Sequence, residues 1–397
     1  MEKICEKKEC TACGICSLVC PAHCIKLKEE KTGAIYPEVD KEKCINCQKC
    51  VKYCPNNKEM LFSYPIKAYA AWSKDTLIRS FAASGGIASE LYQYAIKNNW
   101  YAVGALLSKE KHVCFYEVNK NNIESIRNSK YVFSELLDIP EKIKAAIKKG
   151  KNVLFIGLPC QNAAIKSFLR EPQMLQRVIF VDLVCHGVPS QAYFRDYIDT
   201  IEKRYRRKAE EITFRGAHSS YLISIKDKEK KEFYKKDINS NDIYYAAFAE
   251  NLNFRENCYC CKYARKERIT DLTLGDYSGL EKEISLVLIN TRRGNEFLDN
   301  IKKDNKLQLV EKPVQEALSA PGNKQLREPS SRNPNRDIFL QVYIYTSDYK
   351  KAVKKAMGKQ LFLRQVAGVY SQCIGWVSSK LNPCQKKKIK QIFRLIK

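Results

Sequence analysis

The sequence lacks the features that mark secreted, membrane-spanning and nucleotide-loop proteins. Its 397 residues include only 16 Gly and 13 Pro, and it contains no G-x-G-x-x-G or Walker-type loop, which argues against a Rossmann or P-loop nucleotide site. No apolar run approaches the roughly eighteen residues of a membrane span. The opening stretch MEKICEKKEC has no apolar core and is therefore not a signal peptide. These absences predict a folded cytoplasmic protein.

Acidic residues are scarce as well. The sequence has 44 Asp and Glu against 70 Lys and Arg, a formal net charge of +26. From Ser347 onward, 13 basic residues face the single acidic residue Asp348. Because so much of the charge lies in this terminal segment, it favours an acidic partner or an anionic membrane surface over nucleic acid. Such a segment is more commonly a helix that is docked on the protein or exposed to solvent. The more specific hypothesis is that it makes peripheral contact with the inner face of the membrane.

Cysteine, by contrast, is abundant, with 18 residues. A run of three cysteines at three-residue steps, followed by Cys-Pro, occurs twice, and each cysteine of the second run lies 34 residues after its counterpart. This is the bacterial ferredoxin pattern for two [4Fe–4S] clusters, in which the fourth cysteine of each run binds the other cluster. The predicted ligands are Cys10, Cys13, Cys16 and Cys54 for one cluster, and Cys44, Cys47, Cys50 and Cys20 for the other.

Zinc and disulfides are the plainer explanations of so many cysteines. Zinc sites usually combine two cysteine pairs across a longer spacer, without a triple run that ends in Cys-Pro. Disulfides need an oxidising compartment, and nothing in the sequence indicates export. The two-cluster interpretation is therefore favoured, and it implies single-electron transfer in a reducing, anaerobic cell.

Beyond residues 1–64, strand and helix patterns alternate, which predicts an α/β layered domain. Strands are expected at 66–72, 101–107, 152–157, 178–187, 271–276 and 285–291, and helices at 83–98, 139–150, 161–169, 191–208 and 292–303. The stretches 211–216, 221–227 and 232–236 suggest a strand meander on this core. The predicted class is α+β: a two-cluster ferredoxin domain (1–64), a larger α/β domain (65–336) and a basic, mostly helical tail (337–397).

A second group of cysteines lies in the larger domain. Cys160 and Cys185 directly follow predicted buried strands, whose ends meet at one edge of a sheet. Cys258 and Cys261 form a CxxC pair, so these four cysteines suffice for a third [4Fe–4S] cluster. A buried cysteine is as often a small apolar residue as a metal ligand. Spacing alone favours neither the apolar role nor the third cluster. The apolar role suits Cys5, Cys24, Cys114, Cys373 and Cys384.

Seven stretches carry a resemblance to a known family. In order they are SGGIASELYQYAI, NSKYVFS, VLFIGLPCQNAAI, DLVCHGVPS, FRENCYCCKYA, DLTLGDYSG and SLVLINT. Over about residues 1 to 340 the chain resembles the coenzyme F-420 hydrogenase/dehydrogenase beta subunits, including members with an N-terminal two-cluster ferredoxin domain. The resemblance implies a flavoprotein that binds FAD beside a [4Fe–4S] cluster, with Cys160, Cys185, Cys258 and Cys261 as ligands and Cys260 as a neighbour.

The resemblance also assigns a flavin site. Ser84-Gly85-Gly86 is a helix entry with free N–H groups that suit a pyrophosphate, although it can equally be a simple N-cap with two flexible glycines. Lys130 becomes a phosphate or flavin contact. Asp276 shapes the flavin pocket or is a turn residue. His186 supplies a proton or hydrogen bond to the flavin, or makes a structural hydrogen bond.

The resulting prediction is an oxidoreductase. It would pass electrons between a ferredoxin-type carrier or partner subunit and an organic hydride donor or acceptor, either the deazaflavin coenzyme or another small molecule. FAD and [4Fe–4S] clusters would carry the chemistry, because a flavin handles electron pairs and a cluster handles single electrons. The alternative is a non-catalytic electron-transfer subunit of a larger redox complex.

Overall fold

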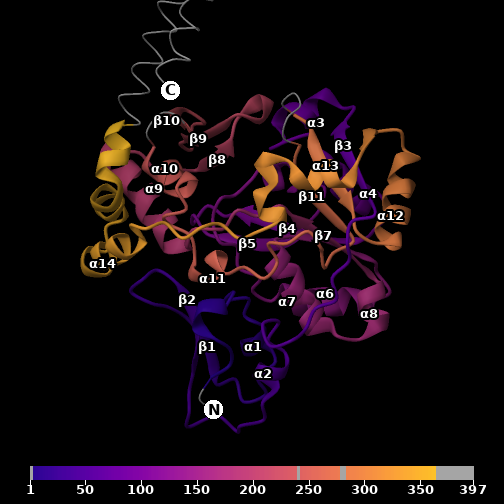
Figure 1. Cartoon of the computed structure of the whole chain (residues 1–397), viewed down its shortest axis with the longest axis horizontal. Helices are drawn as coiled ribbons and strands as arrows, with labels where there is room; N and C mark the ends of the chain where they lie inside the picture. Colours follow the sequence, from indigo (N-terminus) through magenta and orange to yellow (C-terminus); the bar gives the residue numbers. More distant parts are fainter. Residues whose placement is uncertain (1–2, 239–241, 278–282, 364–397) are drawn as a thin grey trace, which may run out of the picture.

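The computed structural model describes residues 3–238, 242–277 and 283–363 (Figure 1). Most of the predicted basic tail, from residue 364 on, lies outside these residues. Within the described part of the chain, no helix is long and apolar enough to cross a membrane.

The cysteine repeat is also a structural repeat. The N-terminal module holds the hairpin of β1 (Ile25–Glu29) and β2 (Ile35–Val39) and two short helices, α1 (Ile15–Leu18) and α2 (Lys49–Lys52), with a 3-10 turn η1 (Lys7–Glu9) before them. Each helix starts after a residue in the left-handed region, Gly14 at φ 79° and Gln48 at φ 61°. These caps are 34 residues apart, as are the cysteines, so both loops turn in the same way.

The larger domain is built on a mixed sheet, which in the described residues has eight strands. β4, β6, β7 and β11 are parallel, and the flanking strands pair antiparallel. The carboxyl ends of the parallel strands therefore meet at one edge. In spatial order the strands are β13 (Leu307–Lys312), β3 (Lys67–Ser73), β12 (Ser285–Ile289), β11 (Leu272–Asp276), β7 (Val178–Leu183), β6 (Val153–Gly157), β4 (Tyr101–Leu107) and β5 (Val113–Val118).

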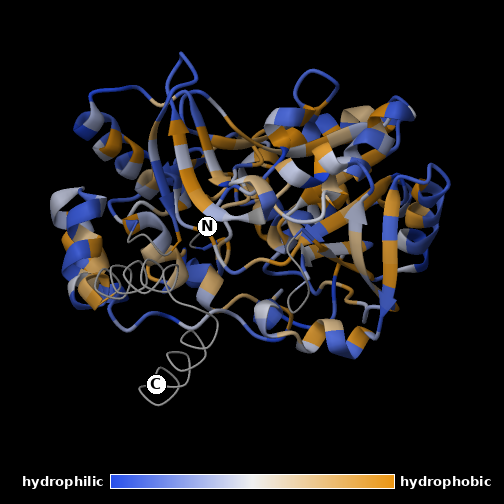
Figure 2. Ribbon diagram, turned by 90° about the horizontal axis from the view of Figure 1, so that it is seen from above, coloured by the Kyte–Doolittle hydropathy of each residue, from blue (hydrophilic) through white to orange (hydrophobic). Residues whose placement is uncertain are grey.

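Helices bury both faces of this sheet, so its central strands are hydrophobic on both sides. Leu154 and Ile156 of β6 pack in the core beneath α4 (Ile87–Lys97) and α12 (Arg292–Lys302). Val153 and Phe155 pack on the other face, with α6 (Ile139–Lys148) and α7 (Pro159–Leu169). Figure 2 shows hydrophobic residues along the strands and hydrophilic ones on the outer loops.

A third layer covers one end of the sheet. The predicted meander is an antiparallel sheet in the order β10 (Glu232–Asp237), β9 (Tyr221–Lys226), β8 (Glu211–Arg215). Its core is aromatic and is shared with α9 (Gln191–Tyr205), α10 (Ile243–Ala249), α14 (Arg336–Thr346) and the helix at 349–363. The remaining elements are α3 (Thr76–Phe81), α5 (Ile123–Ile126), α8 (Pro172–Gln176), η2 (Ala217–Ser219), α11 (Glu256–Tyr259), α13 (Val314–Ser319) and η3 (Pro321–Leu326).

The N-terminal module packs directly against the larger domain, next to α11 and α7 (Figure 1). Ile15 of α1 belongs to the core beneath α7. The connecting segment is also anchored, because Ser63 and Arg268 exchange backbone hydrogen bonds of 2.8 Å. The predicted domain boundary near residue 64 therefore separates two sets of elements that share a packed interface.

Candidate functional site

The structure brings the predicted ligands together in the crossed arrangement. Cys10, Cys13 and Cys16 line one cavity of ≈ 320 Å³ with Cys54 from the second repeat, and we call it the first cavity. A second cavity of ≈ 290 Å³ is lined by four other cysteines from both repeats. Those are Cys44, Cys47, Cys50 and Cys20.

Each of these cavities also holds a fifth cysteine that spacing did not single out. Cys5 lines the first cavity, and its thiol hydrogen-bonds the Cys10 and Cys54 side chains, which lowers the pKa of both. Cys24 lines the second, with its Sγ 3.4 Å from that of Cys20. These contacts, rather than simple apolar packing, describe the two residues.

The electrostatics of the first cavity favour a bound cation. Burial raises the pKa of Cys13 to about 12 and that of Cys16 further. At neutral pH such thiols are protonated unless a metal compensates the thiolate charge. Among the described residues, no three His, Cys, Asp or Glu side chains converge tightly enough for a single metal ion. Cysteines spread around a cavity fit a polynuclear cluster better than zinc.

The second group of predicted ligands also meets, at the carboxyl edge of the parallel strands. Cys160 lies in the first turn of α7, directly after β6, and Cys185 follows β7. Cys258 in α11 and Cys261 after it complete the set, and all four line one cavity of ≈ 580 Å³, the third cavity. Cys260 points elsewhere: it is exposed, with its Sγ 3.4 Å from the Lys8 carbonyl.

The wall of the third cavity carries an unusual number of unsatisfied polar groups. Five of its lining residues have a buried side-chain atom that lacks a hydrogen-bond partner among the described residues. Leaving a buried polar group of this kind without a hydrogen bond costs about 1–3 kcal/mol. A negatively charged cluster would satisfy the donors, so the wall fits such a group. The atoms are Arg255 Nε, Arg268 Nε, Tyr263 Oη, Asn257 Oδ1 and Gln325 Oε1.

The third cavity lies next to the first. Arg255 lines the third, and its guanidinium donates to the carbonyl of Thr11, at 2.8 Å, which lines the first. Lys262 Nζ donates to the Pro55 carbonyl at 2.8 Å, beside Cys54. The two sets of cysteines are thus joined through single side chains.

The predicted phosphate loop is explained in part by packing. Ser84 Oγ donates to the Ile284 carbonyl at 2.7 Å, and Gly85 N–H donates to Ser285 Oγ at 2.9 Å. A Cβ on Gly85 would lie 2.3 Å from the Ala71 carbonyl oxygen, so glycine is needed there for the approach of two strands. Gly86, at φ 82°, caps α4.

Lys130 does not present a free ammonium group. Its Nζ donates to the carbonyls of Ser125, Ile126, Arg127 and Asn128 at 2.7–3.3 Å, at the end of α5. Burial lowers the pKa of Lys130 to about 7. Lys130, the predicted phosphate contact, is therefore hydrogen-bonded to backbone carbonyls. It holds the loop that carries the next residue, Tyr131.

Asp276, at the end of β11, belongs to a hydrogen-bonded set of side chains whose other members were not predicted from the sequence. It accepts hydrogen bonds from Arg215 Nη1 at 3.2 Å and from Tyr221 Oη at 2.8 Å. Arg215 is buried, also donates to Tyr131 Oη at 3.1 Å and to the Ala83 carbonyl, and leaves its Nε without a partner in the described protein. An orphaned guanidinium N–H beside the phosphate loop fits an anionic cofactor group.

His186 connects this group with the third cavity. It follows Cys185 and lines that cavity. His186 is exposed, and partial desolvation of its ring lowers the pKa of His186, while the carboxylate of Asp276 opposes this shift. Its backbone carbonyl accepts a hydrogen bond from Ser330 Oγ at 2.6 Å.

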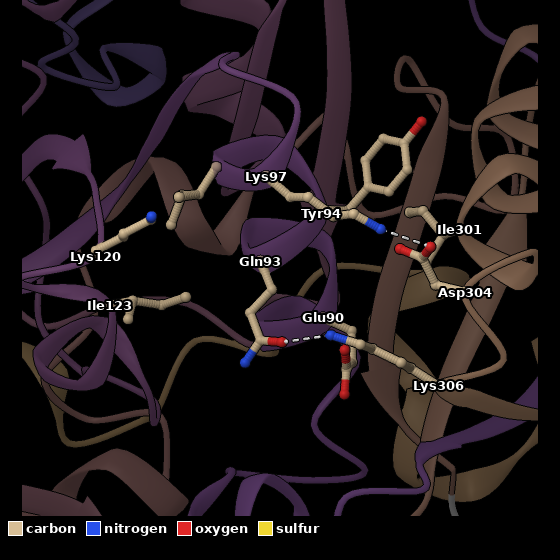
Figure 3. A pocket seen from close by; sticks show the side chains of 10 residues that line it. Glu90, Gln93, Tyr94, Lys97, Lys120, Ile123, Ile301, Asp304 and Lys306 are labelled. Atoms are coloured by element: carbon tan, nitrogen blue, oxygen red, sulfur yellow. Dashed lines mark hydrogen bonds and ion pairs between the residues drawn. The ribbon is translucent and has the colours of Figure 1, made fainter.

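A separate groove along α4 is lined by none of the predicted site residues (Figure 3). Its lining includes three lysines and two carboxylates. Lys97 pairs with Asp304 at 2.8 Å, and Lys306 reaches Gln93 Oε1 at 3.4 Å. Its charges are largely matched within the groove.

Known proteins resemble both parts of the chain. Residues 9–58 match the family model described as 4Fe-4S dicluster domain, and residues 150–315 match the model for the C terminus of the beta subunit of coenzyme F420 hydrogenase/dehydrogenase. A subunit of the F(420)H(2) dehydrogenase of Methanosarcina mazei is 22% identical over 77% of this chain and 85% of its own length. The coenzyme F420-dependent sulfite reductase of Methanocaldococcus jannaschii is 23% identical over 90% of this chain but only 56% of its own length.

A solved structure is similar as well. A chain of the F420-reducing [NiFe] hydrogenase complex from Methanosarcina barkeri aligns with 75% of this chain and 91% of its own length, at 17% identity and a TM-score of 0.46.

Proposed function

The chain joins a 4Fe-4S dicluster domain to a beta-subunit domain of the coenzyme F420 hydrogenase/dehydrogenase family, and we propose that it is an iron–sulfur flavoprotein oxidoreductase. It passes electrons between an organic hydride donor or acceptor and a one-electron carrier or partner subunit. The observation that carries this proposal is a series of three cysteine-lined cavities: the third adjoins the first through the Arg255 contact, and cysteines of the first and second belong to one packed cluster.

Each set of residues has a distinct task. The twelve predicted ligands hold three [4Fe–4S] clusters. Arg215 and the loop at 83–86 hold the phosphates of FAD, while Asp276 fixes the direction of the Arg215 guanidinium. His186 lies between this group and Cys185 and donates a hydrogen bond or proton toward the flavin. When bound, the flavin exchanges electron pairs with a hydride donor and single electrons with a cluster.

The substrate side is proposed from the relatives. Two of them carry coenzyme F420 in their names, so the reduced deazaflavin is the first hydride donor to test. The chain spans little more than half of the sulfite reductase, and sulfite reduction is not part of the proposal.

The carrier side is the second cavity. There Cys47 is exposed, and the neighbouring Ile45 has 66% of its surface exposed. A redox partner can approach these residues closely, whereas the predicted ligand cysteines of the first and third cavities are buried or half-buried. The M. mazei relative is named as a subunit, so the alternative proposal is that this chain relays electrons inside a complex without turning over a substrate itself.

The test is the cofactor content of anaerobically purified protein, followed by turnover. About 12 iron atoms with one FAD per chain are expected, four irons for each of three clusters. About 8 iron atoms per chain without flavin would contradict the proposal that the chain is an enzyme. With cofactors present, oxidation of a hydride donor by the isolated chain, coupled to reduction of a one-electron dye, separates the enzyme from the relay subunit.

A further inference from the structure

Two buried side chains, Arg255 and Tyr263, form the wall between the third cavity and the first. Both line the third cavity and are only 4% and 3% exposed. Both also carry a donor without a partner among the described residues. The packing around Arg255 and Tyr263 does not explain why each has a donor without a partner.

Arg255 is held from the ferredoxin side. Its Nη1 donates to the Thr11 carbonyl at 2.8 Å and its Nη2 to the Cys10 carbonyl at 3.4 Å. The guanidinium lies 4.2 Å from the ring centre of Phe133, another residue of the third cavity. Among the described residues no carboxylate pairs with it, so its positive charge is available to neighbouring anions.

Tyr263 lies between the two sets of cysteines. Its side chain packs with Cys160 and Cys261 of the third cavity, and its chain neighbour Lys262 donates to the Pro55 carbonyl beside Cys54. A tyrosine hydroxyl carries a proton at neutral pH and can donate it. It has no acceptor in the described protein.

The backbone of Tyr263 is fixed independently of its hydroxyl. Arg268 Nη1 donates to the Tyr263 carbonyl at 3.0 Å, and Arg268 Nη2 donates to the buried carboxylate of Asp182 at 2.7 Å. The ring packs with Ala163 and Ile269. Removing the hydroxyl alone should thus leave the fold of this wall intact.

We propose that the Tyr263 hydroxyl donates a hydrogen bond to the [4Fe–4S] cluster of the third cavity and, with the charge of Arg255, raises its reduction potential. The inference rests on the proposed function, because it requires the third cluster. A cluster becomes more negative on reduction, so a donor beside its sulfurs stabilises the reduced form more than the oxidised form.

The experiment compares wild type with Tyr263→Phe, which removes only the oxygen. Only the difference between the hydrogen bond's strength to the reduced and to the oxidised cluster shifts the potential, so we expect the reduced-to-oxidised ratio to fall by up to about tenfold, a shift of up to about 59 mV for one electron. Redox titration monitored by EPR measures it, and the step that is missing in Cys160→Ser identifies the third cluster. Tyr259→Phe is the control, since Tyr259 Oη binds the Asn251 carbonyl at 2.6 Å and does not line the cavity.

A second measurement does not depend on a variant. In wild type, pulsed EPR of the reduced third cluster should show an exchangeable proton that disappears in D₂O and in Tyr263→Phe. Full iron with neither this proton nor a change in potential overturns the proposal for Tyr263. About 8 iron atoms in wild type would instead remove the third cluster itself, and with it the proposed function.

Discussion

At the scale of the residue, a cysteine binds iron only as the thiolate, and burial opposes that ionised form. In the third cavity burial raises the pKa of Cys258 to about 11, and the charge of Cys261 adds to the shift. On the proposed function, a bound cluster supplies the compensating charge that lets such thiols ionise.

Serine substitutions of Cys160, which lines the third cavity, and of Cys260, which does not, test the ligand assignment. Cys160→Ser should lower the iron content from about 12 to about 8 atoms per chain, because it removes one of four converging ligands. Cys260→Ser, two residues from Cys258 but outside the cavity, should keep the full content. Iron and sulfide assays with EPR of the reduced protein measure both. Equal iron in the two variants would contradict the ligand assignment.

The residues found from the sequence are those whose spacing is itself informative. CxxC steps and the Cys-Pro ending restrict the chemistry strongly, so the eight ferredoxin-type cysteines could be singled out as candidate ligands before the structure. Arg215, Arg255 and Tyr263 carry no such signal, because each is a single residue whose partners lie far away in the sequence. Arg255 meets Thr11 across 244 positions, and only the packed fold shows that contact.

At the scale of the element, the strands with continuous apolar runs were predictable and the edge strands were not. β6, in the middle of the sheet, is buried at every position. β5 and β13, which the sequence did not reveal, are the two outermost strands. In β13 only Leu307 is buried, and the exposed and half-buried residues that follow include charged ones, as in edge strands that avoid pairing with other chains. The missed strands therefore share one physical cause.

The entry to α4 follows its prediction. The helix begins at Ile87, directly after the predicted entry Ser84-Gly85-Gly86, with Gly86 as its N-cap. The sequence did not reveal the tertiary contacts of this entry: Ser84 and Gly85 bond to Ile284 and Ser285, and the Ser73 N–H of β3 donates to the Gly85 carbonyl at 2.7 Å.

Gly85→Ala tests the joint between β3, β12 and α4. Its Cβ would meet backbone atoms at 2.3 and 2.8 Å, so we expect a loss of about 1–3 kcal/mol in unfolding free energy and weaker flavin retention. Gly358→Ala, in the helix at 349–363 with nothing within 4 Å, is the control. It should be stabilising by about 0.5–1 kcal/mol. Denaturant titration compares them, and a neutral effect at Gly85 would refute the close packing.

At the scale of the whole molecule, the charge of +26 has a kinetic consequence. Association with an acidic one-electron carrier should be fast at low salt and slow markedly as the Debye length falls from about 30 Å at 0.01 M to about 8 Å at 0.15 M. Stopped-flow reduction rates measure this. A neutral small dye is the control, and equal salt dependence for both would contradict electrostatic steering.

On the proposed ligand assignment, the crossing between the two repeats also sets an order of events during synthesis. Because the first and second cavities each take one cysteine from the other repeat, neither repeat would bind a whole cluster by itself as it leaves the ribosome. The earliest complete set of four appears only when Cys50 has emerged, and the other waits for Cys54. Iron delivery to these two sites would then follow the translation of almost the entire N-terminal module.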